Sequence, residues 1–132
     1  MDDKIANALL TDQTIDITTT GRVSGQLRKI EIWFHNLDGR LFITGLPGPR
    51  DWYANLVANP DFTFHLKEST QSDLPARARP IIAEDERREI LSIITQNLGR
   101  DDDLETWLEQ SPLVEVNLQL VQINKAFPIR KR

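Results

Sequence analysis

Apolar and polar residues alternate with a period of two over much of the chain, which is typical of strands that bury one face. The clearest stretch runs from Gln26 to Asn36, where Ile30, Ile32 and Phe34 fall on one face. Asp38-Gly39 follows, and this dipeptide favours a tight hairpin because both turn positions need positive φ. The pattern therefore predicts an antiparallel sheet. Its strands are expected at residues 14–20, 26–36, 40–45, 61–68, 74–83 and 113–124.

Helical spacing marks the segments between those strands. From Glu84 to Leu98 apolar residues recur on one face, the first turn is acidic, and Gly99 stands where a C-terminal glycine belongs. Shorter helices are expected at 1–10, 52–59 and 101–110. About six strands with two to four helices indicate a mainly β chain of the α+β class. A small antiparallel β-barrel with helical insertions is favoured, and an open α+β sandwich is the alternative.

Composition narrows the class of protein. A chain of 132 residues with 39% hydrophobic residues suits one domain over 1–132, with a helical arm at 1–12 and a basic tail at 125–132. The net charge of −4 argues against a nucleic-acid partner. The chain has no cysteine, which excludes disulfides, and no long apolar run typical of a signal peptide or a membrane span. We expect a cytoplasmic protein.

The turn between the first two strands carries distinctive chemistry. Its sequence is GRVSG at 21–25, and Arg28 follows in the next strand. Arginine offers a planar fork of donors and glycine lets a ligand approach the main chain, so Arg22, Ser24 and Arg28 suit a phosphate or a carboxylate. From spacing alone, an ordinary solvated hairpin with surface arginines is the simpler interpretation, since exposed charges contribute little to stability.

Two other places are candidates for binding. The loop GLPGPRDW brings Arg50 to the start of a predicted helix, whose free amides favour anions, but Asp51 is expected to cap those amides itself. A rigid capped turn explains the loop equally well. Trp33 shares its strand face with charged residues rather than aliphatic ones, which suits a ligand groove or a subunit contact. Trp52 is expected in the core.

Side chains with recognisable catalytic spacing are not found in the sequence. It contains no nucleophile elbow, no Walker loop and no dinucleotide fingerprint. His35 and His65 are the only histidines, and without cysteine or zincin spacing a metal site is not expected. Catalytic residues cannot be named from the sequence. If the protein is an enzyme, the chemistry belongs to a bound cofactor.

Several motifs in order resemble the deazaflavin-dependent nitroreductase family: TTTGRVSGQLR, DGRLFITG, GPRDWYANLVANPDFTFHLK, ARARPI and DERREIL. That family is similar to the flavin-binding split β-barrels of the pyridoxamine phosphate oxidase type. The resemblance covers about residues 15 to 124. It implies a split antiparallel β-barrel, commonly a homodimer, that binds coenzyme F420. The implied reaction is hydride transfer from the reduced deazaflavin to a small electron-poor acceptor such as a quinone, an enone or a nitro compound.

The same resemblance implies which residues contact the cofactor's phosphate-bearing tail. They are Arg22, Ser24, Gly25, Arg28, Gly48, Arg50 and Trp52. The chain departs from the family pattern in two places: its second loop is short and has arginine in place of lysine, and Val23 replaces a residue that is often basic. Both departures lower the positive charge near an anionic tail. FMN is therefore the alternative cofactor, and a non-catalytic module that binds a small ligand or a protein is the alternative function.

Overall fold

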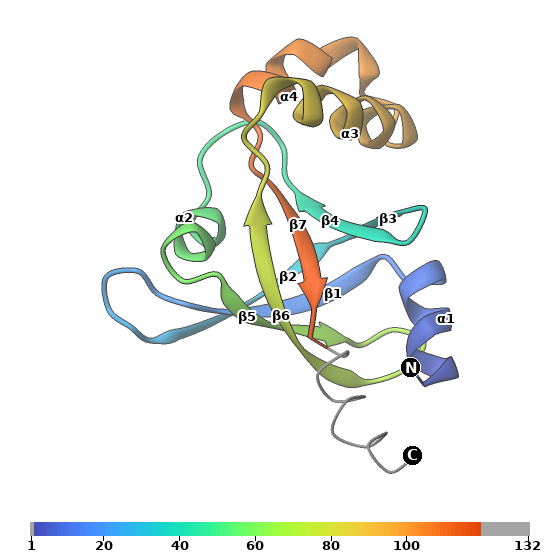
Figure 1. Ribbon diagram of the computed structural model, residues 1–132, viewed down its shortest axis with the longest axis vertical. Coiled ribbons are helices and arrows are strands. Elements are labelled where there is room, and N and C mark those ends of the chain that lie inside the picture. The colour runs from blue at the N-terminus through green and yellow to red at the C-terminus, as the bar shows by residue number, and fades with distance from the viewer. Residues whose placement is uncertain (1, 120–132) are drawn as a thin grey trace, which may run out of the picture.

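The computed structural model describes residues 2–119. Its strands are β1 (Thr14–Thr20), β2 (Leu27–Trp33), β3 (His35–Leu37), β4 (Arg40–Thr44), β5 (Asp61–Leu66), β6 (Ser72–Pro80) and β7 (Leu113–Leu118). Its helices are α1 (Asp3–Thr11), α2 (Asp51–Ala58), α3 (Glu84–Asn97) and α4 (Leu104–Gln110), with a 3-10 turn at Asp101–Asp103. The strands form one antiparallel sheet in the order β2-β1-β5-β6-β7-β4-β3, which curls into a half-barrel (Figure 1). The predicted split barrel of the α+β class is confirmed.

The long strand predicted at 26–36 is in fact two strands, so the sheet has seven strands rather than about six. β2 pairs with β1, β3 pairs with β4, and β2 and β3 lie at opposite edges of the sheet. Between them Phe34 is only 2% exposed, and its N–H donates to the Gln13 carbonyl at 3.0 Å. At this buried residue the chain bends and passes from one edge of the sheet to the other. That bend leaves the alternation of residue types unchanged, so the sequence pattern does not reveal it.

The hairpin predicted at Asp38-Gly39 is confirmed. Asp38 has a φ of 53° and Gly39 a φ of 90°, the left-handed values that a two-residue hairpin turn needs. The side chain of Asn36 also accepts a hydrogen bond from the Gly39 N–H at 2.8 Å. The turn joins β3 to β4, which pair antiparallel as expected.

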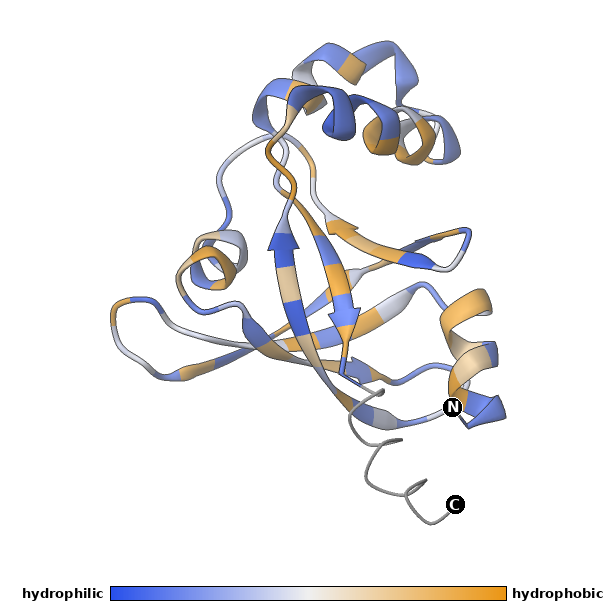
Figure 2. Cartoon of the chain, viewed as in Figure 1, coloured by the Kyte–Doolittle hydropathy of each residue, from blue (hydrophilic) through white to orange (hydrophobic). Residues whose placement is uncertain are grey.

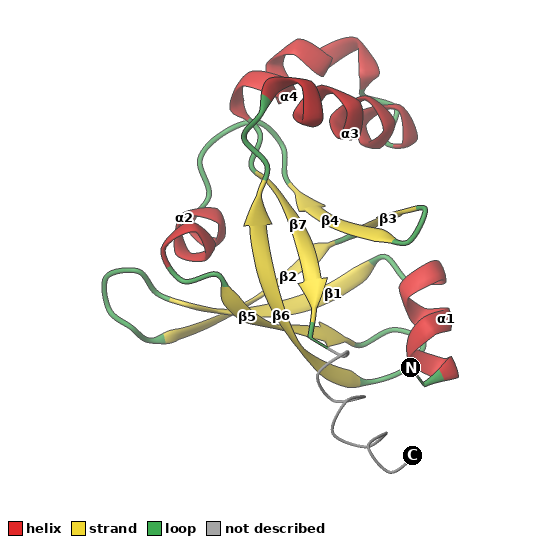
Figure 3. Ribbon diagram, in the orientation of Figure 1, coloured by secondary structure: helices red, strands yellow, loops and turns green. Residues whose placement is uncertain are grey.

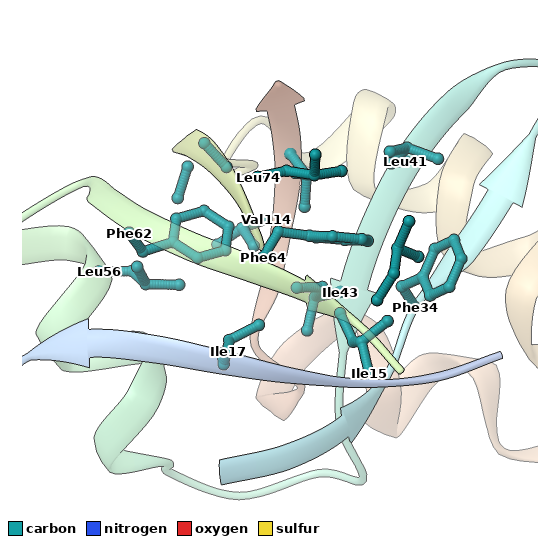
Figure 4. Packing of buried hydrophobic residues seen from close by; sticks show 14 of the residues in the cluster. Ile15, Ile17, Phe34, Leu41, Ile43, Leu56, Phe62, Phe64, Leu74 and Val114 are labelled. Atoms are coloured by element: carbon teal, nitrogen blue, oxygen red, sulfur yellow. The ribbon is translucent and has the colours of Figure 1, made fainter. Parts of the chain in front are cut away.

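The main core lies inside the curled sheet and is built from alternate strand positions. Figure 2 shows hydrophilic and apolar residues alternating along β6 and β7. On β5, Phe62, Phe64 and Leu66 are buried as predicted. Phe64 packs edge to face against Phe34, with ring centroids 5.3 Å apart. α2 packs beside these strands and contributes Leu56 to the same cluster (Figure 4).

β2 departs from the predicted burial pattern. Alternation predicts Ile30 inside the barrel, but 36% of Ile30 is exposed. Leu27 and Trp33 on the same strand are 71% and 47% exposed. The reason is the position of β2 at the edge of the sheet, where it is hydrogen-bonded only to β1. An edge strand with exposed apolar side chains is a surface to which another molecule can bind.

α3 and α4 form a helical hairpin at one end of the sheet, inserted between β6 and β7 (Figure 3). It has its own apolar cluster, formed by Phe42, Ile81, Ile90, Leu91, Ile94, Trp107 and Leu113. α3 ends as predicted. Gly99 has a φ of 71°, and the Arg100 N–H donates to the Thr95 carbonyl at 2.7 Å, which closes the last turn.

The predicted segments at the two ends of the chain are only partly covered by the described residues, 2–119. α1 lies within the predicted arm at 1–12, and the Asp2 carboxylate caps it by accepting from the Lys4 N–H at 2.6 Å. The strand predicted at 113–124 is present as β7, which ends at Leu118. Residues 120–124 of the predicted strand and the basic tail at 125–132 lie outside the described range. None of the helices in residues 2–119 has the length and apolar character needed to span a bilayer.

Candidate functional site

The turn at 21–25 has a conformation that depends on its glycines. The Gly21 N–H donates to the Gln26 carbonyl at 2.8 Å, and a Cβ at Gly21 would come within 2.8 Å of the Ser24 Oγ. Gly25 has a φ of 72°, in the left-handed region that favours glycine. The Ser24 Oγ accepts a hydrogen bond from the Gln26 N–H at 3.1 Å and keeps its own proton to donate. The turn is thus a compact, pre-shaped loop.

Arg22 is held in place by α2. Its backbone N–H and its guanidinium both donate to the Asn55 Oδ1, at 3.1 and 2.9 Å. Asn55 is 5% exposed, and its amide lies 3.5 Å from the Thr19 hydroxyl. The guanidinium also lies 3.5 Å from the Asp51 carboxylate, whose side chain is 93% exposed. A buried amide therefore orients Arg22, while its ion pair with Asp51 stays accessible to solvent.

A cleft of about 500 Å³ opens between this turn, β2 and the start of α2, and we call it the turn cleft. Its lining combines polar and charged residues with apolar ones: Arg22, Ser24, Arg28 and Asp51 among the first, and Val23, Ile30 and Trp52 among the second. Trp52 is 7% exposed, so it belongs to the core, as expected, and also forms a wall of the cleft. The two arginines and Ser24 suit an anionic group, and Ile30 and Trp52 suit a flat apolar ring.

The start of α2 differs from the sequence-based interpretation. Asp51 was expected to cap the helix, but the N-cap residue is Arg50 and no side chain caps the amides. Asp51 lies in the first turn and approaches Arg22 instead. The uncapped amides keep their preference for an anion.

Gly48 and Arg50 do not line the turn cleft with the other predicted site residues. They line a second cleft, of about 560 Å³, between α2, the loop before it and the α3–α4 hairpin, and we call it the helix cleft. The Arg50 guanidinium donates to the backbone carbonyls of Pro49 and Leu46, both at 2.9 Å. Gly25 shapes the turn but does not line the turn cleft.

Arginines outside the two clefts are mostly ion-paired. Arg79 contacts Glu86 and Glu115 at 2.6 and 2.8 Å, and Arg77 contacts Asp61 at 2.9 Å. Arg77 and Arg79, which alternate along β6, therefore belong to a surface of paired charges. In residues 2–119 the arginines without a carboxylate partner are Arg28, Arg50, Arg87 and Arg100, and the first three of them line a cleft.

The two histidines lie apart. His65 on β5 is hydrogen-bonded to the Thr18 hydroxyl and to the Asp73 carboxylate, both at 2.7 Å. Hydrogen bonding to His65 lowers the pKa of Asp73. Burial lowers the pKa of His35 on β3. Groups of three or more metal-binding side chains are not found within the described part of the chain.

Sequence reasoning missed Asn55 as a functional residue. It lies within the WYANLVANP motif but reads as an ordinary polar position of a short helix. Its role depends on a contact with Arg22, 33 positions earlier, and only the folded chain shows that contact. A signal was present in the sequence, because asparagine is a poor helix former and is costly to bury without partners.

Comparison with known proteins identifies the family. The sequence model of one protein family, F420H(2)-dependent quinone reductase, matches residues 2–119, which is almost the whole chain. The chain belongs to this family. As a member of the F420H(2)-dependent quinone reductase family it is an F420-dependent oxidoreductase, and its cofactor is F420. The resemblance recognised in the sequence motifs is confirmed.

Several solved structures share the split-barrel fold of this member of the F420H(2)-dependent quinone reductase family. An F420-H2 dependent reductase (FDR-A) has a TM-score of 0.60 at 21% identity, over 80% of this chain and 95% of that one. HutZ, the heme storage protein from Vibrio cholerae, has a TM-score of 0.68 at 15% identity, over 89% of each chain. A candidate pyridoxamine 5′-phosphate oxidase from Listeria innocua has a TM-score of 0.68 at 12% identity, over 89% and 92%. At these identities the likeness concerns the fold alone.

Proposed function

We propose that the protein transfers a hydride from reduced F420 to a small electron-poor organic acceptor and binds the cofactor in the turn cleft. The main support is the combination of residues that line this cleft. Arg28 has no carboxylate partner in residues 2–119, and it lines the same cleft as the apolar residues Ile30 and Trp52. A cofactor with a flat ring and an anionic tail needs both kinds of surface. The named family supports the choice of F420 over FMN.

Five residues of the turn and of its cleft have a task in this proposal. Arg22 and Arg28 bind the phosphate-bearing tail with their guanidinium groups, and the Ser24 hydroxyl donates a further hydrogen bond. Gly25 permits the turn, and Trp52 supports the ring. Gly48 and Arg50 line the helix cleft, so we do not include them among the cofactor ligands.

The acceptor is a quinone, an enone or a nitro compound. When bound, reduced F420 supplies the hydride, so the chain itself must bind, orient and shield the reacting partners from water. Val23 and Ile30 are 92% and 36% exposed beside the proposed ring position, and they offer an apolar surface on which a flat acceptor can lie. No side chain is assigned a catalytic role.

We also propose a homodimer that uses β2. This edge strand presents free backbone groups and the exposed side chains of Leu27 and Trp33, which a second copy would cover. Light scattering after gel filtration measures the mass directly. Trp33→Glu should shift a dimer toward the monomer, because a charge at an apolar contact is costly to desolvate. A cytoplasmic location, expected from the acidic and cysteine-free sequence, is part of the same proposal.

The test is a titration of F420, and in parallel of FMN, with the pure protein, followed by fluorescence anisotropy. Saturable F420 binding in the range of about 1 μM or tighter, followed by oxidation of reduced F420 when a quinone is added, is the expected result. Tight binding of FMN alone would assign the flavin instead. Binding of F420 without turnover of any quinone, enone or nitro compound would favour a non-catalytic binding module.

A further inference from the structure

The helix cleft is separate from the turn cleft, although adjacent residues of α2 line the two. Trp52 faces the turn cleft and Tyr53 the helix cleft, and their rings are perpendicular. The far wall of the helix cleft comes from the α3–α4 hairpin. Its loop wall is fixed by a hydrogen bond from the Gly48 N–H to the Gln110 carbonyl at 3.0 Å. The volume of about 560 Å³ is within the range of small-molecule sites.

Arg87 is the first unusual feature of this cleft. Its guanidinium donates to the backbone carbonyls of Ile81, Trp107, Leu108 and Ser111, at distances between 2.7 and 3.3 Å. All four acceptors are neutral, and no carboxylate of residues 2–119 lies within ion-pair distance. Burial of the guanidinium lowers the pKa of Arg87. The side chain is therefore rigidly oriented while its charge is not neutralised.

Arg50 repeats this situation at the opposite wall. Its guanidinium donates to two carbonyls of its own loop, and in the described residues it has no carboxylate partner. The arginines on the β6 face, in contrast, pair with Asp61, Glu86 and Glu115. Two guanidinium groups without a counter-ion thus line one cleft, and such groups favour an anion.

Ser111 supplies an independent observation. It lines the helix cleft, it is 4% exposed, and its Oγ has no hydrogen-bond partner within residues 2–119. Buried hydroxyl groups are nearly always paired, because an unpaired one loses its bonds to water without replacement. Its backbone carbonyl accepts from Arg87 at 2.7 Å, so the hydroxyl belongs to the same residue that holds the guanidinium. The Oγ is enclosed as well as unpaired, so the hydroxyl must rotate about χ1 toward the cleft before a bound acceptor atom can satisfy it.

The remaining lining limits the kind of anion. Ala54, Ile82 and Leu108 make apolar walls, and Ile82 is 77% exposed. Glu84 and Glu109 lie at the exposed rim, and Glu84 is already paired with Arg88 at 3.0 Å. Rim carboxylates disfavour a multiply charged ligand. A single charge on an apolar body fits this combination best.

We propose that the helix cleft binds a small organic carboxylate with an apolar body, held by Arg87 and the Ser111 hydroxyl, with Arg50 at the opposite wall. This ligand is separate from F420 and occupies a site distinct from the turn cleft. The site is assigned whether or not the turn cleft holds the cofactor. Benzoate has the required charge and shape, and benzamide is its neutral isostere.

The experiment is a titration of the full chain with benzoate and with benzamide, followed residue by residue in amide NMR spectra. Benzoate is expected to shift the amides of Gly48, Tyr53 and Ser111 saturably, and benzamide to bind at least about tenfold more weakly, the loss of one charge-assisted hydrogen bond. A saturating amount of F420 is expected to leave benzoate bound. Equal binding of benzamide, shifts confined to the turn cleft, or displacement by F420 would each overturn the proposal.

Variants locate the contact. Ser111→Ala removes a hydroxyl with no partner in the described chain, so it should fold normally and weaken benzoate about three- to tenfold. Arg50→Gln removes one guanidinium without touching the bonds of Arg87 and should weaken benzoate by a similar factor. Arg77→Gln on the β6 face is the matched control and should change nothing. Benzoate affinity that is unchanged in both cleft variants would also overturn the proposal.

Discussion

Replacing Arg22 by alanine tests the turn cleft most directly. A charge-assisted hydrogen bond to a phosphate contributes about 1.5–3 kcal/mol. Arg22 must first give up part of its contact with Asp51, and because the two side chains are 41% and 93% exposed, that pair contributes at most about 1 kcal/mol. The net loss for Arg22→Ala is therefore about 0.5–3 kcal/mol. That corresponds to a Kd for F420 that rises about 2- to 160-fold.

The fold should tolerate this change. The buried Asn55 Oδ1 keeps the hydrogen bond from the backbone N–H of residue 22 at 3.1 Å when the guanidinium is removed. Circular dichroism and the urea midpoint should therefore change little, which separates lost binding from lost folding. Arg77→Ala, which removes an arginine of similar exposure from β6, is the control.

Asp51→Asn provides the opposite perturbation. Removing the carboxylate frees Arg22 for the ligand and removes repulsion of an anionic tail, so F420 should bind up to about fivefold more tightly. The measurement is the same anisotropy titration at fixed ionic strength, because salt screens both effects. A folded Arg22→Ala protein with unchanged affinity, together with no gain in Asp51→Asn, would refute the placement of the tail in this cleft.

Three further outcomes follow from the fold. Gly21→Ala places a Cβ 2.8 Å from the Ser24 Oγ, so urea unfolding should show a loss of about 1–3 kcal/mol and F420 should bind more weakly. Phe64→Ala empties a fully buried core position and should lower the free energy of unfolding by about 3–5 kcal/mol in the same assay. Hydrogen bonds from Arg40 lower the pKa of Glu115, so the urea midpoint should fall as the pH drops below about 4.3, the ordinary glutamate value. Glu115→Gln should reduce this pH dependence, and an equal fall of the midpoint in the variant would contradict the account.

Local signals in the sequence predict most of the elements. The hairpin at Asp38-Gly39 and the end of α3 at Gly99 follow from φ values that glycine adopts easily, and such preferences act over a few residues. The inward faces of β5 and β6 follow from alternation in strands with neighbours on both sides. The turn that contains Arg22 was recognisable for the same reason.

Long-range contacts decide what the sequence could not predict. The break at Phe34 depends on a hydrogen bond to Gln13 and on the other strands that bury the ring. Arg50 is two positions from Trp52, yet the two line different clefts, and the Gly48 N–H next to Arg50 is bonded to the Gln110 carbonyl of α4. The family resemblance groups Gly48, Arg50 and Trp52 as contacts of one cofactor, and this division between two clefts depends on contacts that no sequence motif shows. The anchoring of Arg22 by Asn55 belongs to the same class of contact.

The insertion of the α3–α4 hairpin has an evolutionary consequence. The strands on either side of it are hydrogen-bonded neighbours, and the Ile81 N–H donates to the Leu113 carbonyl at 3.0 Å, so the excursion leaves and rejoins the sheet at one point. The entropy of closing such a loop grows slowly with its length. The inserted hairpin can therefore be lengthened or shortened, and its residues can be exchanged, with little strain on the barrel. The helix cleft can diversify among related proteins while the turn cleft stays unchanged.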